Sequence, residues 1–274
     1  LDGFLPNTLR ACMPSPSETS SEARPARTHW DDAWGDQNIT DIEPTALPFD
    51  RDATDRTFLR RLAELPRANV LELGCGEGRL AVHLAQQGAN VTAIDTSPAA
   101  VEIARRYAIH NDVADRVSVE VLDATNLERL EDTFDLVTGR FVLHHIEPFD
   151  TFAATLDRVT TANARGLFLE NSARNRLLMF FRHYLTGRLG VPQYGDGEEH
   201  PLTPGEIDTL RSRFHVETHH PEMVFLRKVN TYLLGYDNGW GRVVDLIEST
   251  DELLYRLLPF LRKYSYLQLV ELRS

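Results

Sequence analysis

The chain has 274 residues, 42% of them hydrophobic, and a formal net charge of −12 at pH 7. A chain of this size can bury a full core as one α/β domain with an insertion or cap, and we expect no second complete domain. The acidic balance argues against a nucleic-acid binder, because neutralising phosphate groups needs a basic face.

The cysteines and the apolar runs set the expected location. Cys12 and Cys75 lie far apart in unlike contexts, so they give neither a disulfide framework nor a metal-ligand spacing. We therefore predict no metal site and a cytoplasmic, reducing environment. No apolar run has the length of a transmembrane helix, and the first residues lack the apolar stretch of a signal peptide. We expect a chain that is soluble or at most peripheral to a membrane.

The N-terminal part divides into a tail and the start of a domain. Residues 1–28 are rich in Pro, Ser, Thr and Arg without sustained periodicity, which predicts a mobile tail. The domain is expected to span residues 29–274. It begins with the aromatic, acidic stretch HWDDAWGD and continues into a helix over 52–65.

From residue 69 the sequence alternates between short β-rich runs and helical patterns. Such an order predicts a parallel sheet wound by right-handed crossovers. Gly88 can end the first of these helices, and Ser97 followed by Pro98 is typical of a helix start. The expected strands are Asn69–Leu73, Asn90–Ile94, Val117–Leu122, Phe134–Thr138 and Gly166–Glu170, and the expected helices are Gly78–Gln87, Pro98–His110, a short one near Leu127, and Phe149–Thr161.

After Glu170 this rhythm breaks. Two segments, about 171–201 and 225–263, have basic, apolar helical patterns and are predicted to be cap insertions. Between and after them we expect a helix over 203–214 and strands over 216–219 and 264–272.

A glycine turn follows the first strand directly and opens a helix. Gly74, Gly76 and Gly78 allow backbone amides to approach a ligand where a Cβ would obstruct it. Their G-x-G-x-G spacing departs by one residue from the G-x-G-x-x-G fingerprint of dinucleotide sites. Asp95 ends the next strand, where a carboxylate can accept both hydroxyls of a ribose.

Four motifs in order carry a resemblance that covers about Asn69 to Asn171. ELGCGEG, VTAIDTS, VLDATNL and FDLVTGRFVLHHI resemble the successive motifs of the class I S-adenosylmethionine (SAM)-dependent methyltransferases. The resemblance implies that the glycine turn lies against the methionine and ribose of SAM and that the carboxylates ending the next strands hold the ribose and the adenine edge. It implies cofactor-binding roles for Gly74, Cys75, Gly76, Asp95, Asp123 and Ala124, and we further predict cofactor contacts for Glu72, Thr96 and Arg140.

Each of these roles has a structural alternative. Glu72 either serves the methionine amino group through water or supports the glycine turn. Asp95 could be an ordinary strand-end cap, and Asp123 could belong to any turn. Cys75 is expected to contribute its backbone and a small buried side chain, because nothing nearby predicts an activated thiolate.

The segment after the fourth strand should border both ligands, since open parallel sheets bind at the carboxyl ends of their strands. Arg140, Phe141 and Leu143 are predicted to line the SAM pocket. Trp30 and Trp34 either cover the sulfonium, where an aromatic face favours a cation, or pack the N-terminal helix.

Two adjacent histidines, His144 and His145, are the candidate catalytic residues. Methyl transfer mainly requires positioning of the acceptor, and a base is needed only where the acceptor must lose a proton. Imidazole titrates near neutral pH, which suits that task. The alternative is that one or both point into the structure.

The cap bears on the substrate class. Apolar residues of 171–190 recur at helical spacing beside arginines, and LLYRLLPFLRKYSYL repeats this mixture. Such helices either touch a membrane surface or an apolar acceptor, or pack together over the active site. Polar residues at the end of the fifth strand and in the cap either contact the acceptor or are solvated: Glu170, Asn171, His183, Tyr184, Glu199 and His200.

We therefore predict a Rossmann-like α/β fold, a seven-stranded mixed sheet with the last strand antiparallel and helical cap insertions. The predicted function is transfer of the SAM methyl group to an oxygen, nitrogen or carbon of a small organic or lipid-like acceptor. The alternatives are a non-catalytic SAM-binding or partner-binding module and a nicotinamide-dependent oxidoreductase, which the glycine spacing disfavours.

Overall fold

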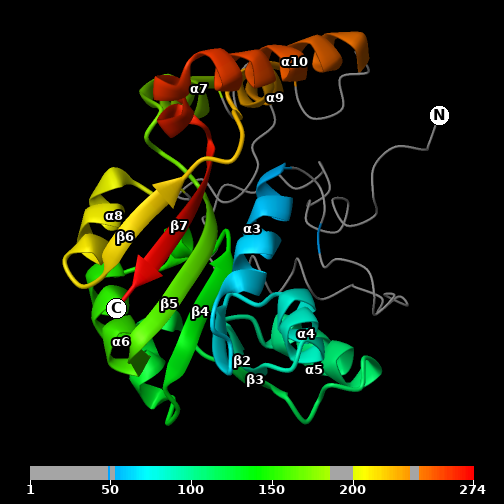
Figure 1. Cartoon of the computed structure of the whole chain (residues 1–274), viewed down its shortest axis with the longest axis vertical. Helices are drawn as coiled ribbons and strands as arrows, with labels where there is room; N and C mark the ends of the chain where they lie inside the picture. Colours follow the sequence, from blue (N-terminus) through cyan, green and yellow to red (C-terminus); the bar gives the residue numbers. More distant parts are fainter. Residues whose placement is uncertain (1–48, 50–52, 186–199, 235–240) are drawn as a thin grey trace, which may run out of the picture.

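The fold is a seven-stranded sheet with helices on both faces and a helical cap at one end (Figure 1). The computed structural model describes residue 49 and residues 53–185, 200–234 and 241–274. The strands are β1 (Asn69–Leu73), β2 (Asn90–Asp95), β3 (Val117–Val121), β4 (Phe134–Arg140), β5 (Thr160–Asn171), β6 (His215–His219) and β7 (Leu267–Arg273). The helices are α3 (Ala53–Glu64), α4 (Arg79–Gln86), α5 (Pro98–His110), α6 (Phe149–Val159), α7 (Arg176–Leu185), α8 (Pro204–Arg211), α9 (Leu226–Leu234) and α10 (Gly241–Leu257), with short 3-10 helices η1 (Ala124–Arg129), η2 (Leu143–His145) and η3 (Pro259–Tyr264).

The strand order is β3-β2-β1-β4-β5-β7-β6. Strands β1 to β5 pair in parallel, whereas β7 is antiparallel to both β5 and β6. The predicted mixed sheet with an antiparallel last strand is confirmed. The carboxyl ends of β1, β2 and β4 therefore meet at one edge, which is where such sheets bind ligands.

Successive strand residues face opposite layers of helices. Val70 packs into a cluster that includes side chains of α3, α4 and α5, and Leu71 packs into a cluster that includes side chains of η1, α6 and α8. Both side chains are fully buried. This two-sided burial explains why β1 reads as a continuous apolar run interrupted by one acidic residue, Glu72.

Local sequence signals fix several element ends. The side chain of Ser97 accepts the N–H of Ala100 at the start of α5, and Thr203 and Glu206 form a reciprocal capping box at α8. Gly88 adopts a left-handed φ of 94° after α4. Strand β5 begins earlier than predicted, at Thr160, because the β-branched Thr160 and Thr161 leave the helix and extend the strand.

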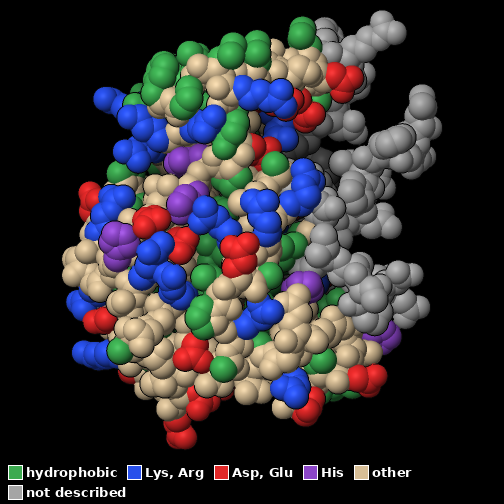
Figure 2. Space-filling model, viewed as in Figure 1, with side chains coloured by type: hydrophobic (Ala, Val, Ile, Leu, Met, Phe, Trp, Pro, Cys, Tyr) green, Lys and Arg blue, Asp and Glu red, His purple; other side chains and the backbone are tan. Residues whose placement is uncertain are grey.

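The cap consists of α7, α9, α10 and η3, and Figure 1 shows it at one end of the sheet. It has a small apolar cluster of its own around Leu178, Val224, Tyr266 and Leu267. Figure 2 shows further hydrophobic side chains exposed along the outer edge of this cap. Within the described residues, no helix combines the length and the apolar character needed to cross a membrane.

Candidate active site

The glycine turn lies between β1 and α4 and fits closely against the turn after β4. Gly74 and Gly78 have positive φ values of 61° and 77°, which glycine adopts without steric cost. A Cβ on Gly74 would lie 2.6 Å from Cγ2 of Val142, and one on Gly78 would lie 2.7 Å from Cβ of Ala104. The turn thus requires glycine both for its backbone shape and for the space around it.

Asp95 is joined to this turn through the backbone. Its Oδ2 accepts the N–H of Gly76 at 2.9 Å, and its Oδ1 accepts the N–H of Ser97, also at 2.9 Å. The N–H of Cys75 donates to the carbonyl of Ile94 at 3.0 Å, so the turn and the end of β2 are fixed together. Each carboxylate oxygen can accept further hydrogen bonds, which leaves Asp95 able to bind a diol.

Glu72 is a buried carboxylate beside the turn, with 4% of its surface exposed. Its Oε2 has no hydrogen-bond partner within the described part of the chain. Burial raises its pKa from 4.5 to about 8, against the lowering effects of a backbone hydrogen bond at Ala81 and of the charge of Arg140. A ligand cation or hydrogen-bond donor that reached this buried acceptor would gain more binding free energy than at an exposed one.

Arg140 ends β4 and connects the site to α3. Its guanidinium is 2.6 Å from Oδ1 of Asp55, which is 1% exposed, and it stacks 3.5 Å from the ring centroid of Phe49. The predicted contact of Arg140 with the cofactor pocket stays a prediction. Its proximity to Glu72 agrees with that assignment, since its charge lowers the pKa of the carboxyl.

The remaining predicted cofactor residues lie at neighbouring turns. Thr96 is half-buried between β2 and α5, and Ala124 is a buried residue at the start of η1. Asp123 is exposed and caps η1, with its Oδ1 accepting the N–H and hydroxyl of Thr125 at 2.8 and 2.7 Å. No described residue bonds to its Oδ2, so this oxygen can meet a ligand. Cys75 is buried, and burial raises the pKa of its thiol, in line with an inert side chain.

Glu170 binds the turn after β4 from within the protein. Its Oε1 accepts the N–H groups of Val142 and Leu143, each at 2.8 Å, and its Oε2 is 2.6 Å from Nδ1 of His144. Glu170 is fully buried and His144 is 4% exposed. Glu170 fits neither alternative, acceptor contact nor solvation, because its carboxylate is fully buried and both of its oxygens bind the turn.

His145 lies beside this buried pair. It is half-buried, and its ring centroid is 4.1 Å from that of His144. The preceding turn is locally strained, since Phe141 has a φ of 52°, an uncommon value for a non-glycine residue. The strain is held by the N–H of Phe141, which donates to the carbonyl of Leu169 at 2.7 Å.

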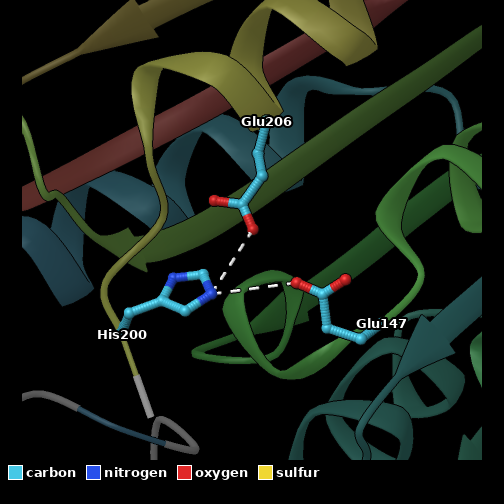
Figure 3. Close-up of side chains that lie close together, drawn as sticks. All are labelled: Glu147, His200 and Glu206. Carbon is cyan, nitrogen blue, oxygen red and sulfur yellow. Dashed lines mark ion pairs between the residues drawn. The ribbon is translucent and has the colours of Figure 1, made fainter. Parts of the chain in front are cut away.

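A second group of ionisable side chains joins the loop after η2 to the start of α8 (Figure 3). Nε2 of His200 is 3.8 Å from Glu147 and 3.9 Å from Glu206, and the potential ligand atoms lie within 4.8 Å of one another. Oε2 of Glu206 already accepts the N–H and hydroxyl of Thr203. Glu147 is 65% exposed. The cluster thus joins the two segments.

Several predicted residues do not join the site or are not described. His183 and Tyr184 are exposed on α7, with ring centroids 4.8 Å apart, in the cap. Trp30, Trp34 and Glu199 lie outside the described residues. Sequence reasoning missed Asp55, and the distance of 85 positions to its partner Arg140 left no local signal that could have identified it.

The comparisons with known proteins agree with this geometry. Residues 70–163 match a family model described as a methyltransferase domain. This match agrees with the predicted resemblance to the SAM-dependent methyltransferases. The matched residues include the glycine turn, Asp95, Asp123 and the two histidines.

Relatives and a solved structure extend the comparison. Over 152 residues the chain is 32% identical to the mitochondrial ubiquinone biosynthesis O-methyltransferase of Schizosaccharomyces pombe, covering 56% of this chain and 53% of that protein. Over 108 residues it is 34% identical to the norajmaline N-methyltransferase of Rauvolfia serpentina, covering 39% and 37%. The chain thus spans about half or less of the length of these relatives.

The fold is shared with the magnesium protoporphyrin IX methyltransferase of Synechocystis PCC 6803, solved with bound S-adenosylhomocysteine (SAH). The TM-score is 0.50 at 18% identity, and the alignment covers 81% of each chain.

Proposed function

We propose that the methyltransferase domain binds SAM at the glycine turn and transfers its methyl group to an oxygen, nitrogen or carbon of a small organic or lipid-like acceptor. The observation that carries the proposal is the buried, unpartnered Oε2 of Glu72, next to a turn that excludes side chains and a carboxylate fixed to its amides. This combination suits a ligand that has an ammonium group and a ribose.

The residues present fit SAM part by part. Glu72 would hold the ammonium of the methionine moiety, whose charge favours the ionised carboxylate. Asp95 would accept the ribose hydroxyls, and Asp123 with the amide of Ala124 would meet the adenine edge. Gly74 and Gly76 would allow close contact along the backbone. When bound, SAM supplies a methyl group on a strongly electrophilic sulfonium, so the protein's task is to position the acceptor and exclude water.

The two histidines have different roles in this proposal. Nδ1 of His144 donates to Glu170, which makes His144 a positioning residue that shapes the turn. His145 is half-buried beside it and is the candidate base where the acceptor must lose a proton. An acceptor that is already nucleophilic would need no base, so the requirement for His145 depends on the atom methylated.

The acceptor class is inferred from the cap and the relatives. α7 follows β5 directly, so the cap stands at the edge of the sheet that carries the site (Figure 1). A cap limits access by large macromolecules and favours a small or lipid-like acceptor. The names of the relatives include an O- and an N-methyltransferase, which supports both atoms as acceptors. The two cysteines give no disulfide framework, which supports a cytoplasmic location as part of the proposal.

The test is a methylation assay with isotopically labelled SAM and a panel of quinol, phenol, amine and fatty acceptors. We expect label in at least one acceptor and none in a Gly74→Val variant, whose side chain would collide with Val142. SAH binding without transfer to any acceptor would instead favour a non-catalytic module. Binding of NAD in place of SAH would favour an oxidoreductase.

A further inference from the structure

The outer face of the cap carries an apolar surface that the core does not use. Six of its side chains are at least half exposed and belong to α7 and α10, and two more lie on η3. We call this set the cap stripe. Its members and exposed fractions are Leu177 (50%), Phe180 (53%), Tyr184 (51%), Leu246 (67%), Leu253 (54%), Leu257 (67%), Phe260 (66%) and Tyr264 (38%).

The orientation of α10 explains why its leucines are exposed. Asp251 is 3% exposed and accepts the N–H groups of Phe225, Leu226 and Arg227 at 3.0 to 3.1 Å, so it anchors one side of α10 to the start of α9. At about 100° per residue, the leucines of the stripe lie about 200–240° around the helix from Asp251. They face away from the protein.

α7 repeats the same arrangement. Leu178 is fully buried in the cap cluster, and the members of the stripe on α7 lie about 200–260° around the helix from it. The amide of Asn175 donates to the carbonyl of Tyr264 at 2.9 Å, which joins the start of α7 to the end of η3. The two helices thus present outward apolar faces from one connected cap.

The charge of the cap is opposite to that of the rest of the chain. Residues 174–185, 226–234 and 241–264 contain nine Lys and Arg and four Asp and Glu, a net charge of +5, so the remainder carries −17 of the total of −12. Arg174, Arg176 and Lys263 are exposed beside the stripe. Figure 2 shows basic side chains below the apolar edge.

The acidic side chains of α10 do not interrupt this pattern. They lie about 60–120° around the helix from Asp251, away from the stripe. Glu248 is 3.7 Å from Arg227, and Glu252 pairs with Arg256. The charges that remain beside the stripe are therefore mainly positive.

We propose that the cap stripe is a docking surface for an anionic phospholipid bilayer, into whose interface the exposed aromatic and leucine side chains insert. Apolar side chains bordered by cations are the combination that binds such interfaces, and aromatic rings favour the headgroup level. This inference does not depend on methyl transfer. It places the cap, and the edge of the sheet below it, where a lipid-like molecule could be received from a membrane.

The test is flotation of the full chain with phosphatidylcholine vesicles that contain or lack phosphatidylglycerol. We expect binding to the anionic vesicles, weakened by salt, and a loss of about tenfold in partitioning for each of Phe180→Ser and Phe260→Ser. Ile109→Ser on α5 is the matched control, because Ile109 is 64% exposed outside the cap. The double variant Arg174→Glu and Arg176→Glu should reduce binding to the anionic vesicles and leave binding to pure phosphatidylcholine vesicles unchanged.

Two further measurements test whether the variants remain folded and whether something other than a bilayer covers the stripe. Circular dichroism and SAH affinity should be unchanged in all these variants, so that a loss of vesicle binding is not a loss of fold. The proposal is overturned if the wild-type chain does not float with anionic vesicles, or if Ile109→Ser weakens flotation as much as Phe260→Ser. A wild-type dimer that Phe260→Ser converts to monomer, without vesicle binding, would show that a second copy covers the stripe.

Discussion

The sheet and the cap hold their polar groups in similar ways but differ in the core behind them. Glu170 near the end of β5 and Asp251 in the cap are both buried carboxylates that accept backbone N–H groups. Glu170 lies within a sheet packed on both faces, whereas among the described residues the core cluster next to Asp251 is the small one of the cap. The sheet is thus packed on both faces, while the cap is a thin layer whose outer side chains are exposed.

The largest effect is expected from Glu170→Leu. The substitution leaves two backbone N–H groups and the imidazole of His144 without their acceptor inside the protein, at a cost of about 3–5 kcal/mol in the free energy of unfolding. Urea denaturation monitored by circular dichroism measures it. Glu170→Gln keeps one acceptor oxygen for the backbone groups and should cost clearly less. Equal stability of Glu170→Leu and wild type would contradict the role of this side chain.

The next effect concerns the glycine turn. Gly74→Ala places a Cβ 2.6 Å from Val142 at a positive φ, so we expect a loss of about 2–3 kcal/mol and a weakened SAH affinity. Gly88→Ala is the matched control, because φ is 94° there but nothing lies within 4 Å of its Cβ. That variant should lose only about 1 kcal/mol and keep its affinity. Thermal denaturation with and without SAH distinguishes the two.

Glu72→Gln tests the buried carboxyl by its pH dependence. Its folded pKa of about 8 exceeds the ordinary 4.5, so between these values the folded state holds a proton that the unfolded chain has released. Stability of the cofactor-free protein therefore falls as pH rises through this window. The variant should match wild type at pH 5 and exceed it by about 3–4 kcal/mol at pH 8. A stability difference that does not change between these pH values would refute the shifted pKa.

The smallest of these effects is expected in the cap. Asp251→Asn removes one of the two acceptor oxygens that hold the start of α9, so global stability should fall by only about 1 kcal/mol. Hydrogen exchange should accelerate at the amides of Phe225, Leu226 and Arg227 and stay unchanged in β1 and β4. Acceleration throughout the sheet would mean that the cap and the sheet unfold as one unit.

The sequence was sufficient to predict elements that depend on local patterns. The helix Pro98–His110 and the strand Asn69–Leu73 have their predicted bounds, because capping residues and apolar periodicity mark them directly. The positions of the glycine turn and of Asp95 at adjacent strand ends follow from the alternation of strands and helices. These are properties of short segments, and a single sequence contains them.

Pairings between distant segments could not be predicted in the same way. Glu170 and His144 are 26 positions apart, and only the register of β4 against β5 brings them together. The acidic residue at the end of β5 therefore suggested an acceptor contact where the structure has an internal hydrogen bond. The outward faces of α7 and α10 were also ambiguous, because a helix that is apolar on several sides does not by itself indicate which side is buried.

The central claim is that the glycine turn and Asp95 form a SAM site, and calorimetric titration with SAH tests it most directly. Asp95→Ala is compared with Asp135→Ala, whose carboxylate accepts the N–H of Asn69 at the opposite end of β1. We expect wild type and Asp135→Ala to bind SAH alike and Asp95→Ala to lose about a hundredfold in affinity, the loss of two charge-assisted hydrogen bonds. Unchanged affinity in Asp95→Ala, or wild-type binding of NAD with no response to SAH, would contradict the account.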